Sequence, residues 1–153
     1  MDSNKQLIHK LYLALKEQDA KTMLSCYHEK ATFKDPVFEL HSKSEIDDMW
    51  TMLCSRAKEF ELTFDEVEAD DSTGSAHVEA KYLFSATGRK VHNKIDANFQ
   101  FQDGLIIEHR DYFDFWRWSR YALGLPGYLL GWTPFLQKKV QKEVRNSMEK
   151  FRG

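Results

Sequence analysis

The fold is decided by residues 91–101, which read Val-His-Asn-Lys-Ile-Asp-Ala-Asn-Phe-Gln-Phe. Apolar and polar side chains alternate with a period of two, which is typical of a strand with one buried and one solvated face. Asp103-Gly104 follows, and an Asp-Gly pair between two apolar runs predicts a tight hairpin. The next strand is expected over residues 105–115. Its inward face would carry His109 and Asp111 beside Ile107, Phe113 and Phe115.

Two further strands are predicted upstream of this hairpin. Alternating Phe60, Leu62 and Phe64 indicate the first, and residues 76–84, which include Tyr82, indicate the second. Short turns separate them. Residues 60–115 therefore predict an antiparallel meander of four strands.

Helical spacing dominates before residue 58. A first helix carries Leu7, Leu11 and Leu15, and a second begins at the N-cap Asp19. Ala31–Lys34 reads as a short strand that Asp35-Pro36 ends, because the residue before a proline avoids the helical region and proline donates no ladder bond. The second helix is expected to bury Met23, Leu24 and Tyr27; the third opens with the capping box Ser42-x-x-Glu45 and is expected to bury Ile46, Met49, Trp50 and Leu53.

Helices followed by an antiparallel meander predict an α+β fold, with a curved antiparallel sheet packed on three N-terminal helices. A helical extension is expected behind it, with one short helix over residues 116–123 that stops at 124–127. A second helix is expected to start at Thr133-Pro134, with Thr as the N-cap and Pro at the first helical position.

Composition and charge exclude several classes of protein. The chain has 153 residues, of which 42% are hydrophobic and 14% aromatic, so it can bury a core and line a pocket. The net charge of −2 argues against a general nucleic-acid binder. Residues 137–153 carry six cations against two acids, a net of +4, and the remainder therefore sums to −6. This basic tail is either a solvated helix face or a site for an anionic surface.

No cofactor and no metal are expected. The six histidines show no metal-ligand spacing, and Cys26 and Cys54 are not in a ligand motif. Reduced thiols and an N-terminus without an apolar signal region predict a cytoplasmic protein. The longest charge-free stretch, residues 121–137, spans 17 residues, short of the roughly 20 that cross a bilayer.

The order of these features resembles the SnoaL-like branch of the nuclear transport factor 2-like superfamily. The likeness rests on Ala-Thr-Phe-Lys-Asp-Pro-Val at 31–37, the third helix and Glu-His-Arg-Asp-Tyr-Phe-Asp at 108–114. It implies a cone-shaped domain over residues 1–118 with an apolar pocket, a C-terminal extension over 119–153 packed on it, and a homodimer. Ketosteroid isomerases, limonene-epoxide-type hydrolases, polyketide cyclases and non-catalytic carriers share this scaffold, so the fold alone does not decide the function.

The resemblance implies a role for two carboxylates. Ketosteroid isomerases carry their general base in an Asp-Pro-Val segment, which Asp35 matches, but their oxyanion donors fall at Leu11 and Ala97 here. Tyr12 lies one residue from the first of these positions. Asp96 lies one residue from the second, and a shift of one residue reverses the face of a strand. Epoxide hydrolases of this type use the Asp that Asp111 matches, but their partner Arg-x-Asp is replaced here by Val-Glu-Ala-Lys at 78–81.

These matches predict an apolar small-molecule pocket with acid/base chemistry on a polycyclic or terpenoid-like ligand. The catalytic residues would be Asp35, Asp111 and His109, and the ligand would contact Tyr12, Trp50, Tyr82, Ala97, Phe99 and Phe113. Three alternatives stay open. Asp35 can be a plain turn residue and His109–Asp111 a structural pair. The protein can also be a non-catalytic binding module, or it can bind a protein through the open sheet face, which would need an exposed apolar patch there.

The C-terminal segment is rich in aromatic residues, including Trp116, Trp118, Tyr121, Tyr128 and Trp132. It can form a lid or wall of the pocket, or lie on a membrane with the basic helix toward anionic head groups. It can also pack against the same chain or a dimer partner.

Overall fold

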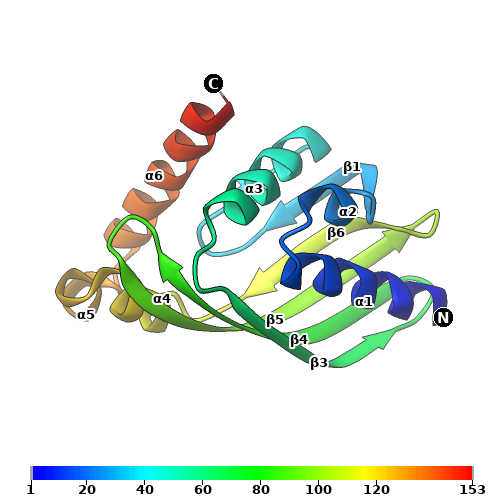
Figure 1. The fold of residues 1–153 in the computed structure, drawn as a ribbon, viewed down its shortest axis with the longest axis horizontal. Coiled ribbons are helices and arrows are strands. Elements are labelled where there is room, and N and C mark those ends of the chain that lie inside the picture. Colours follow the sequence, from blue (N-terminus) through cyan, green and yellow to red (C-terminus); the bar gives the residue numbers. More distant parts are fainter. Residues whose placement is uncertain (1, 153) are drawn as a thin grey trace.

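The computed structural model describes residues 2–152, which form one sheet with helices against one face and a further group of helices at one end (Figure 1). This is the α+β architecture that the sequence predicts. In chain order the helices are α1 (Asp2–Lys16), α2 (Ala20–Leu24), α3 (Lys43–Arg56), α4 (Phe115–Leu123), α5 (Leu125–Leu130) and α6 (Pro134–Arg152).

Six strands make a single curved sheet in the order β2-β1-β6-β5-β4-β3. Helix α1 packs on β3, and α3 packs on β1, so the helices cover the concave side (Figure 1). The strands are β1 (Tyr27–Lys34), β2 (Glu39–Leu40), β3 (Glu61–Ala69), β4 (Thr73–Phe84), β5 (Arg89–Gln102) and β6 (Leu105–Tyr112).

The predicted meander is confirmed, because β3 to β6 pair antiparallel in sequence order. Asp103 and Gly104 both have positive φ, 56° and 75°, which a hairpin turn of two residues favours. The register of β5 and β6 places Ala97 opposite Asp111 and Phe99 opposite His109. All four lie on the concave side of the sheet.

Strand β1 is longer than the prediction and begins at Tyr27, which was expected on the second helix. β1 runs parallel to β6, with Tyr27 opposite Ile106. Helix α2 ends at Leu24, so Tyr27 gains a sheet partner that no local pattern could reveal. The prediction for Tyr27 was therefore wrong about its element, although the side chain is buried.

Leu53 is a second correction. It was expected to face inward, but it is 37% exposed, whereas Met52 is buried. Helix α3 packs on α2 and α6 as well as on β1. A helix with several neighbours buries more than one stripe, so a single-stripe pattern misplaces residues in its last turn. The caps agree with the prediction, since Ser42 accepts from the Glu45 amide at 3.2 Å.

The last strand ends three residues before the predicted limit. β6 stops at Tyr112, and the Asp114 carboxylate then accepts from the Arg117 amide at 3.1 Å as the N-cap of α4. A β-bulge shifts the register near Gln100 and Phe101. Because one extra residue reverses a face, Ile106 is buried in place of the expected Ile107.

The convex face of the sheet is polar. Among the exposed large hydrophobic residues that the structure describes, Tyr112 lies on this face, and the others belong to helices and the segments beside them. Asp96 also lies there, 3.0 Å from His77. The apolar patch that a protein-binding sheet face would need is therefore missing from the described part of the chain.

Helices α4, α5 and α6, residues 115–152, form a cap over the end of the molecule where β1 stops (Figure 1). The side chains of Gln137 and Gln141 both donate to the Pro36 carbonyl, at 3.0 and 2.9 Å. Arg145 pairs with Glu45 of α3 at 3.2 Å. None of the helices within residues 2–152 has the length and hydropathy to cross a membrane.

The corner between α4 and α5 depends on very close backbone packing. Residues 124–127 were predicted to be a stop, but α5 begins at Leu125, directly after Gly124 with φ of 70°. Proline is tolerated at position 126, because backbone amides in the first turn of a helix have no hydrogen-bond partner within the helix. A Cβ on Gly127 would lie 2.1 Å from the Ser119 carbonyl oxygen, so α5 touches the backbone of α4 at this point.

Replacing Gly127 with alanine is therefore expected to destabilise the protein by about 1–3 kcal/mol, because the atom in the way is backbone and cannot rotate aside. Urea denaturation measures the change. Leu125→Ala, at an exposed position of the same helix, is the control and should change stability by about 0.5 kcal/mol or less. Equal stability of Gly127→Ala and wild type would show that α5 moves away from α4 without cost.

Candidate functional site

A chain of hydrogen bonds crosses the concave side of the sheet from α3 to β6. The Trp50 indole N–H donates to the Tyr27 hydroxyl oxygen at 3.1 Å. The Tyr27 hydroxyl lies 2.7 Å from His109 Nδ1, and His109 Nε2 lies 2.8 Å from Asp111 Oδ1. The His109 side chain is 0% exposed and that of Asp111 is 10% exposed, so the chain runs through the interior.

The direction of these bonds follows from the indole. Because an indole N–H only donates, Tyr27 accepts from Trp50 and uses its own hydrogen toward His109 Nδ1. His109 then carries its hydrogen on Nε2 and donates it to the Asp111 carboxylate. This assignment gives each of these groups a hydrogen-bond partner and fixes the orientation of the Asp111 carboxylate.

Aromatic rings surround the histidine. The His109 ring centroid lies 4.5 Å from that of Phe99 and 4.8 Å from that of Phe33. Phe33 in turn contacts Trp50, with ring centroids 6.0 Å apart. These rings exclude water, so the polar chain lies in a medium where its hydrogen bonds and charges act strongly.

Asp35 lies in the turn between β1 and β2. Its Oδ1 accepts from the amides of Val37 and Phe38, at 2.7 and 2.6 Å. The residue keeps some exposure, yet protein atoms crowd its carboxyl group. Desolvation is the largest cause that raises the pKa of Asp35, and the nearby charge of Asp111 adds to it. The two amide bonds lower the pKa, and the net value is about 7.

Each carboxylate has a buried tyrosine near enough to interact with it electrostatically, Tyr82 for Asp35 and Tyr12 for Asp111. Burial raises the pKa of Tyr82 to about 12, with a further contribution from Asp35, and the Trp118 indole donates to its hydroxyl oxygen at 3.0 Å. Burial also raises the pKa of Tyr12 well above its ordinary value, with a smaller contribution from Asp111. Both hydroxyl groups therefore stay protonated at neutral pH and keep a hydrogen that a ligand can accept.

The structure brings most of the residues named from the sequence to one region. Asp35, Asp111, His109, Tyr12 and Tyr82 are linked by the contacts and charges above. Ala97 lies opposite Asp111, and Trp50 and Phe99 belong to the aromatic surroundings. Phe113 is half-buried in the segment that connects β6 to α4. The position of Ala97 is the one that matches the oxyanion-hole Asp of ketosteroid isomerases. In this chain the carboxyl is instead that of Asp111, on the neighbouring strand.

Sequence reasoning did not name Tyr27 and Trp118 as site residues. Tyr27 reaches His109 because β1 pairs with β6 across 82 residues of sequence, and Trp118 reaches Tyr82 from the cap across 36 residues. No spacing rule links such positions. The signal that was available is weaker: both are aromatic residues with a polar hydrogen, and such residues need a partner when buried.

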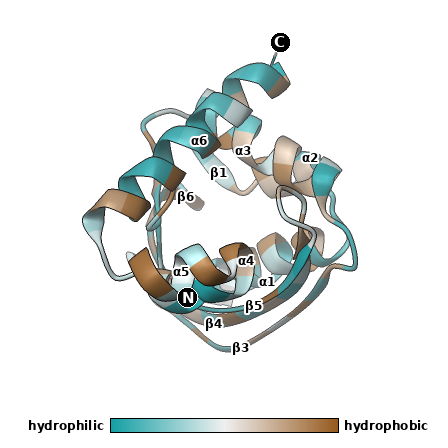
Figure 2. Cartoon of the chain, turned by 90° about the vertical axis from the view of Figure 1, so that its left-hand side faces the viewer, coloured by the Kyte–Doolittle hydropathy of each residue, from teal (hydrophilic) through white to brown (hydrophobic). Residues whose placement is uncertain are grey.

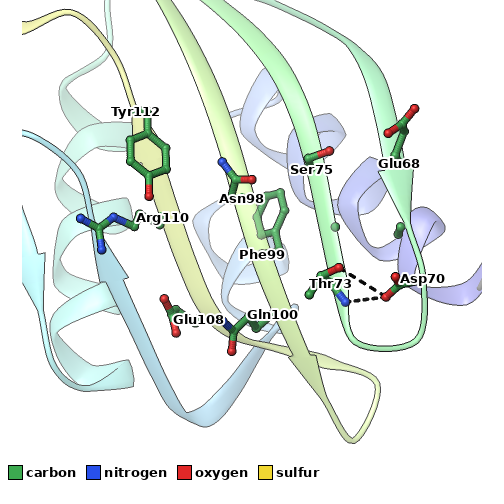
Figure 3. A pocket seen from close by; sticks show the side chains of 12 residues that line it. Glu68, Asp70, Thr73, Ser75, Asn98, Phe99, Gln100, Glu108, Arg110 and Tyr112 are labelled. Carbon is green, nitrogen blue, oxygen red and sulfur yellow. Dashed lines mark hydrogen bonds between the residues drawn. The ribbon is translucent and has the colours of Figure 1, made fainter.

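A hollow of about 580 Å³ lies elsewhere, on the convex face (Figure 3). Tyr112, Arg110, Asn98, Ser75 and Glu68 line it in a row across the strands, and the Asp70 carboxylate accepts from the Thr73 amide at 2.7 Å in its own turn. These side chains are solvated and their partners are local. The interior cluster, with buried carboxylates and neutral tyrosines, is therefore the stronger candidate for chemistry.

Comparison with known proteins agrees with the fold described above. The model of the SnoaL-like domain matches residues 8–109. No curated protein matches the sequence. An LEH-like epoxide hydrolase from M. tuberculosis superposes with a TM-score of 0.69 at 18% identity, covering 84% of this chain and 96% of that one.

Two other solved structures show the same fold. TsrD from Streptomyces laurentii has a TM-score of 0.70 at 20% identity and covers 82% of this chain and 98% of its own. TerC, co-crystallised with polyporic acid, has a TM-score of 0.68 at 13% identity and covers 78% of this chain and 98% of its own. At such low sequence identities the likeness establishes the fold only, so any chemistry has to be argued from the residues of this chain.

Proposed function

The chain belongs to the family of SnoaL-like domains, and we propose that it binds a small apolar molecule between sheet and helices and moves a proton on one of its carbon atoms. The observation that carries this proposal is the Asp35 carboxyl, whose pKa of about 7 makes it half ionised at neutral pH. A general base works best with such a pKa, because it is both present in the basic form and strong enough to take the proton.

The groups around Asp35 have complementary roles. Asp35 takes a proton from a carbon next to a carbonyl group and returns it at another carbon, so nothing is consumed. Tyr82 accepts from Trp118 and keeps its own hydrogen for the substrate oxygen, whose negative charge grows as the proton leaves. Burial is the main reason for the high pKa of Asp35, and the charge of Asp111, which His109 orients, raises that pKa further. Isomerisation and cyclisation of polycyclic ketones are reactions of this class.

The names of the neighbours support a small-molecule function of this kind. Besides the epoxide hydrolase, one neighbour is described as a polyketide cyclase and another as an isomerase from Bacillus subtilis. Epoxide opening is less suited to this site, because residues 78–81 read Val-Glu-Ala-Lys and do not provide the Arg-x-Asp of the hydrolases. Glu79 bonds to His77 and His92 at the convex face and cannot serve the interior.

A series of β,γ-unsaturated cyclic ketones, from cyclohex-3-enone to tetracyclic compounds, tests the proposal. Conversion to the conjugated ketone is followed by ultraviolet absorbance. We expect the rate of at least the larger compounds to rise with pH and level off above a midpoint near pH 7, the Asp35 value. Asp111→Asn should move this midpoint to lower pH, because it removes a neighbouring charge. Rates equal to those in buffer across the series would contradict catalysis.

The second candidate is a non-catalytic binding module, and the cap favours it. Gln137 and Gln141 fasten α6 to Pro36, next to Asp35, which supports a binding site that the cap covers. A carrier benefits from such closure. Native mass spectrometry of protein purified from its own cells separates the two functions. A retained ligand together with no turnover of the ketones supports the carrier.

A further inference from the structure

The exposed apolar side chains of the protein gather on one part of the cap. Helix α5, the short segment after it and the start of α6 carry large hydrophobic residues that are 58–69% exposed: Leu125, Tyr128, Leu129, Trp132 and Phe135. Figure 2 shows brown segments over α5 and the start of α6 at this end of the molecule, and teal farther along α6. We call these five residues the apolar tip. A patch of this kind on a small protein marks a contact surface.

The charge around the apolar tip has one sign. No acidic residue occurs between Asp114 and Glu143, whereas this stretch contains the five cations Arg117, Arg120, Lys138, Lys139 and Lys142. Phe135, Lys138, Lys139 and Lys142 follow the spacing i, i+3, i+4 and i+7, so they share one face of α6. The lysines therefore continue the surface on which the tip lies.

In the part of the chain that the structure describes, no ion pair neutralises these cations. Among residues 2–152 the structure gives none of the five a carboxylate partner, although Arg145 and Arg152 farther along α6 pair with Glu45 and Asp48. The Arg120 guanidinium instead lies over the rings of Trp116 and Tyr128, 4.9 and 5.9 Å from their centroids. Helix α6 thus has a paired side toward α3 and an unpaired basic side beside the tip.

We propose that this end of the cap docks on the surface of an anionic lipid bilayer. Trp, Phe and Leu on one side with Lys and Arg beside them are the composition of helices that lie in a membrane interface, with the apolar side chains among the acyl chains and the cations at the phosphates. Tyrosine and tryptophan suit the boundary, because each ring has a polar atom for the head-group region. The binding is peripheral, by side chains of two short segments.

A second copy of the chain is the weaker occupant. A two-fold contact through the tip would bring five unpaired cations of each protomer toward the same five of its partner, and the stretch from 115 to 142 holds no acid to compensate them. An anionic bilayer can bury the apolar side chains of the tip and neutralise the neighbouring cations at the same time. The attraction is expected to fall with added salt, because screening weakens it.

Co-sedimentation with vesicles tests the proposal, with phosphatidylcholine alone and with ~30 mol % phosphatidylglycerol. We expect wild type to pellet with the anionic vesicles and to stay largely in the supernatant with the neutral ones. The triple variant Lys138→Glu/Lys139→Glu/Lys142→Glu should lower the partition coefficient at least about tenfold. Its control is Lys5→Glu/Lys10→Glu/Lys16→Glu, which makes the same charge change at three exposed positions of α1. This control should stay within about twofold of wild type.

The apolar contribution is tested with Leu129→Ser/Trp132→Ser, which should also lower partition about tenfold or more. Leu13→Ser, at a leucine of α1 that is 53% exposed, is its control and should bind as wild type does. Wild-type protein that stays in the supernatant, binding that ignores phosphatidylglycerol, or equal losses in variants and controls would overturn the proposal. Self-association of wild type that Leu129→Ser/Trp132→Ser abolishes would assign the tip to a second copy instead.

Discussion

Asp35→Asn is expected to make the protein more stable above pH 7 while removing the proposed turnover of ketones. The buried carboxyl has a pKa of about 7 in the folded protein and about 3.9 in the unfolded chain. Below pH 4 both states are protonated and the group costs nothing. As the pH rises from 4 to 7, only the unfolded chain loses its proton, so the stability of wild type falls.

Asparagine resembles the protonated form and does not ionise, so the variant escapes this loss. Its Oδ1 can still accept the amides of Val37 and Phe38. At pH 8 the variant should be more stable than wild type by up to about 4 kcal/mol, which follows from a shift of roughly three pKa units. At pH 4 the two proteins should be nearly equal. Urea denaturation at both pH values measures the difference.

The same variant should lower the turnover of the ketone series by about 10³-fold or more, because it removes the base that accepts the proton. Asp96→Asn is the matched control, since this carboxylate lies on the convex face. It should leave turnover unchanged and the stability within about 1 kcal/mol at either pH. A carbon-13 titration of the Asp35 carboxyl with a midpoint below pH 5 would contradict both expectations, and so would a variant less stable than wild type at pH 8.

His109→Ala is expected to destabilise the fold by about 3–5 kcal/mol. The substitution empties a site that is 1% exposed, and it leaves the Tyr27 hydroxyl and the Asp111 carboxylate without their shared partner in a water-poor interior. Tyr27→Phe removes only the hydroxyl and should cost about 1–2 kcal/mol. Chemical denaturation at pH 7 gives both values, with the exposed His41→Ala as the control at about 0.5 kcal/mol or less.

The double variant tests whether these residues act as one chain. After His109→Ala, the further loss from Tyr27→Phe should shrink by about 1 kcal/mol or more, because the hydroxyl has already lost its acceptor. If His109→Ala does not fold, Tyr27→Phe alone still tests the chain. A loss of unfolding free energy as small as that of His41→Ala would show that the hydrogen bond between Tyr27 and His109 does not stabilise the protein. Additive losses would likewise contradict a coupled chain.

Several parts of the site follow from local sequence. Asp35 before Pro36 predicts a turn, and the structure has this turn, in which the carboxylate accepts the amides of Val37 and Phe38. The period of two in β6 places His109 and Asp111 on one face, where they meet at 2.8 Å. The same rule separates Ala97 from Asp96. These relations extend over at most three residues, so backbone geometry alone determines them.

The errors of prediction have a common cause. Tyr27 was expected on a helix because its partner β6 is far along the chain, and Leu53 was expected inside because the several neighbours of α3 were unknown. Ile106 takes the place of Ile107 because of a bulge that opposes the strand pattern. Helix α5 follows Gly124 where a stop was expected, because α4 provides a backbone surface for Gly127.

Alternation, turn residues and caps thus suffice to predict the fold class and the faces of the strands, because they act between residues a few positions apart. The chemistry of the interior depends on distant segments. The Asp35 pKa of about 7 arises from burial by the folded chain and from the Asp111 charge, 76 residues further on by their numbering. The hydrogen-bond chain from Trp50 to Asp111 exists only when α3, β1 and β6 are assembled, since desolvation and hydrogen bonding between remote side chains require the tertiary structure.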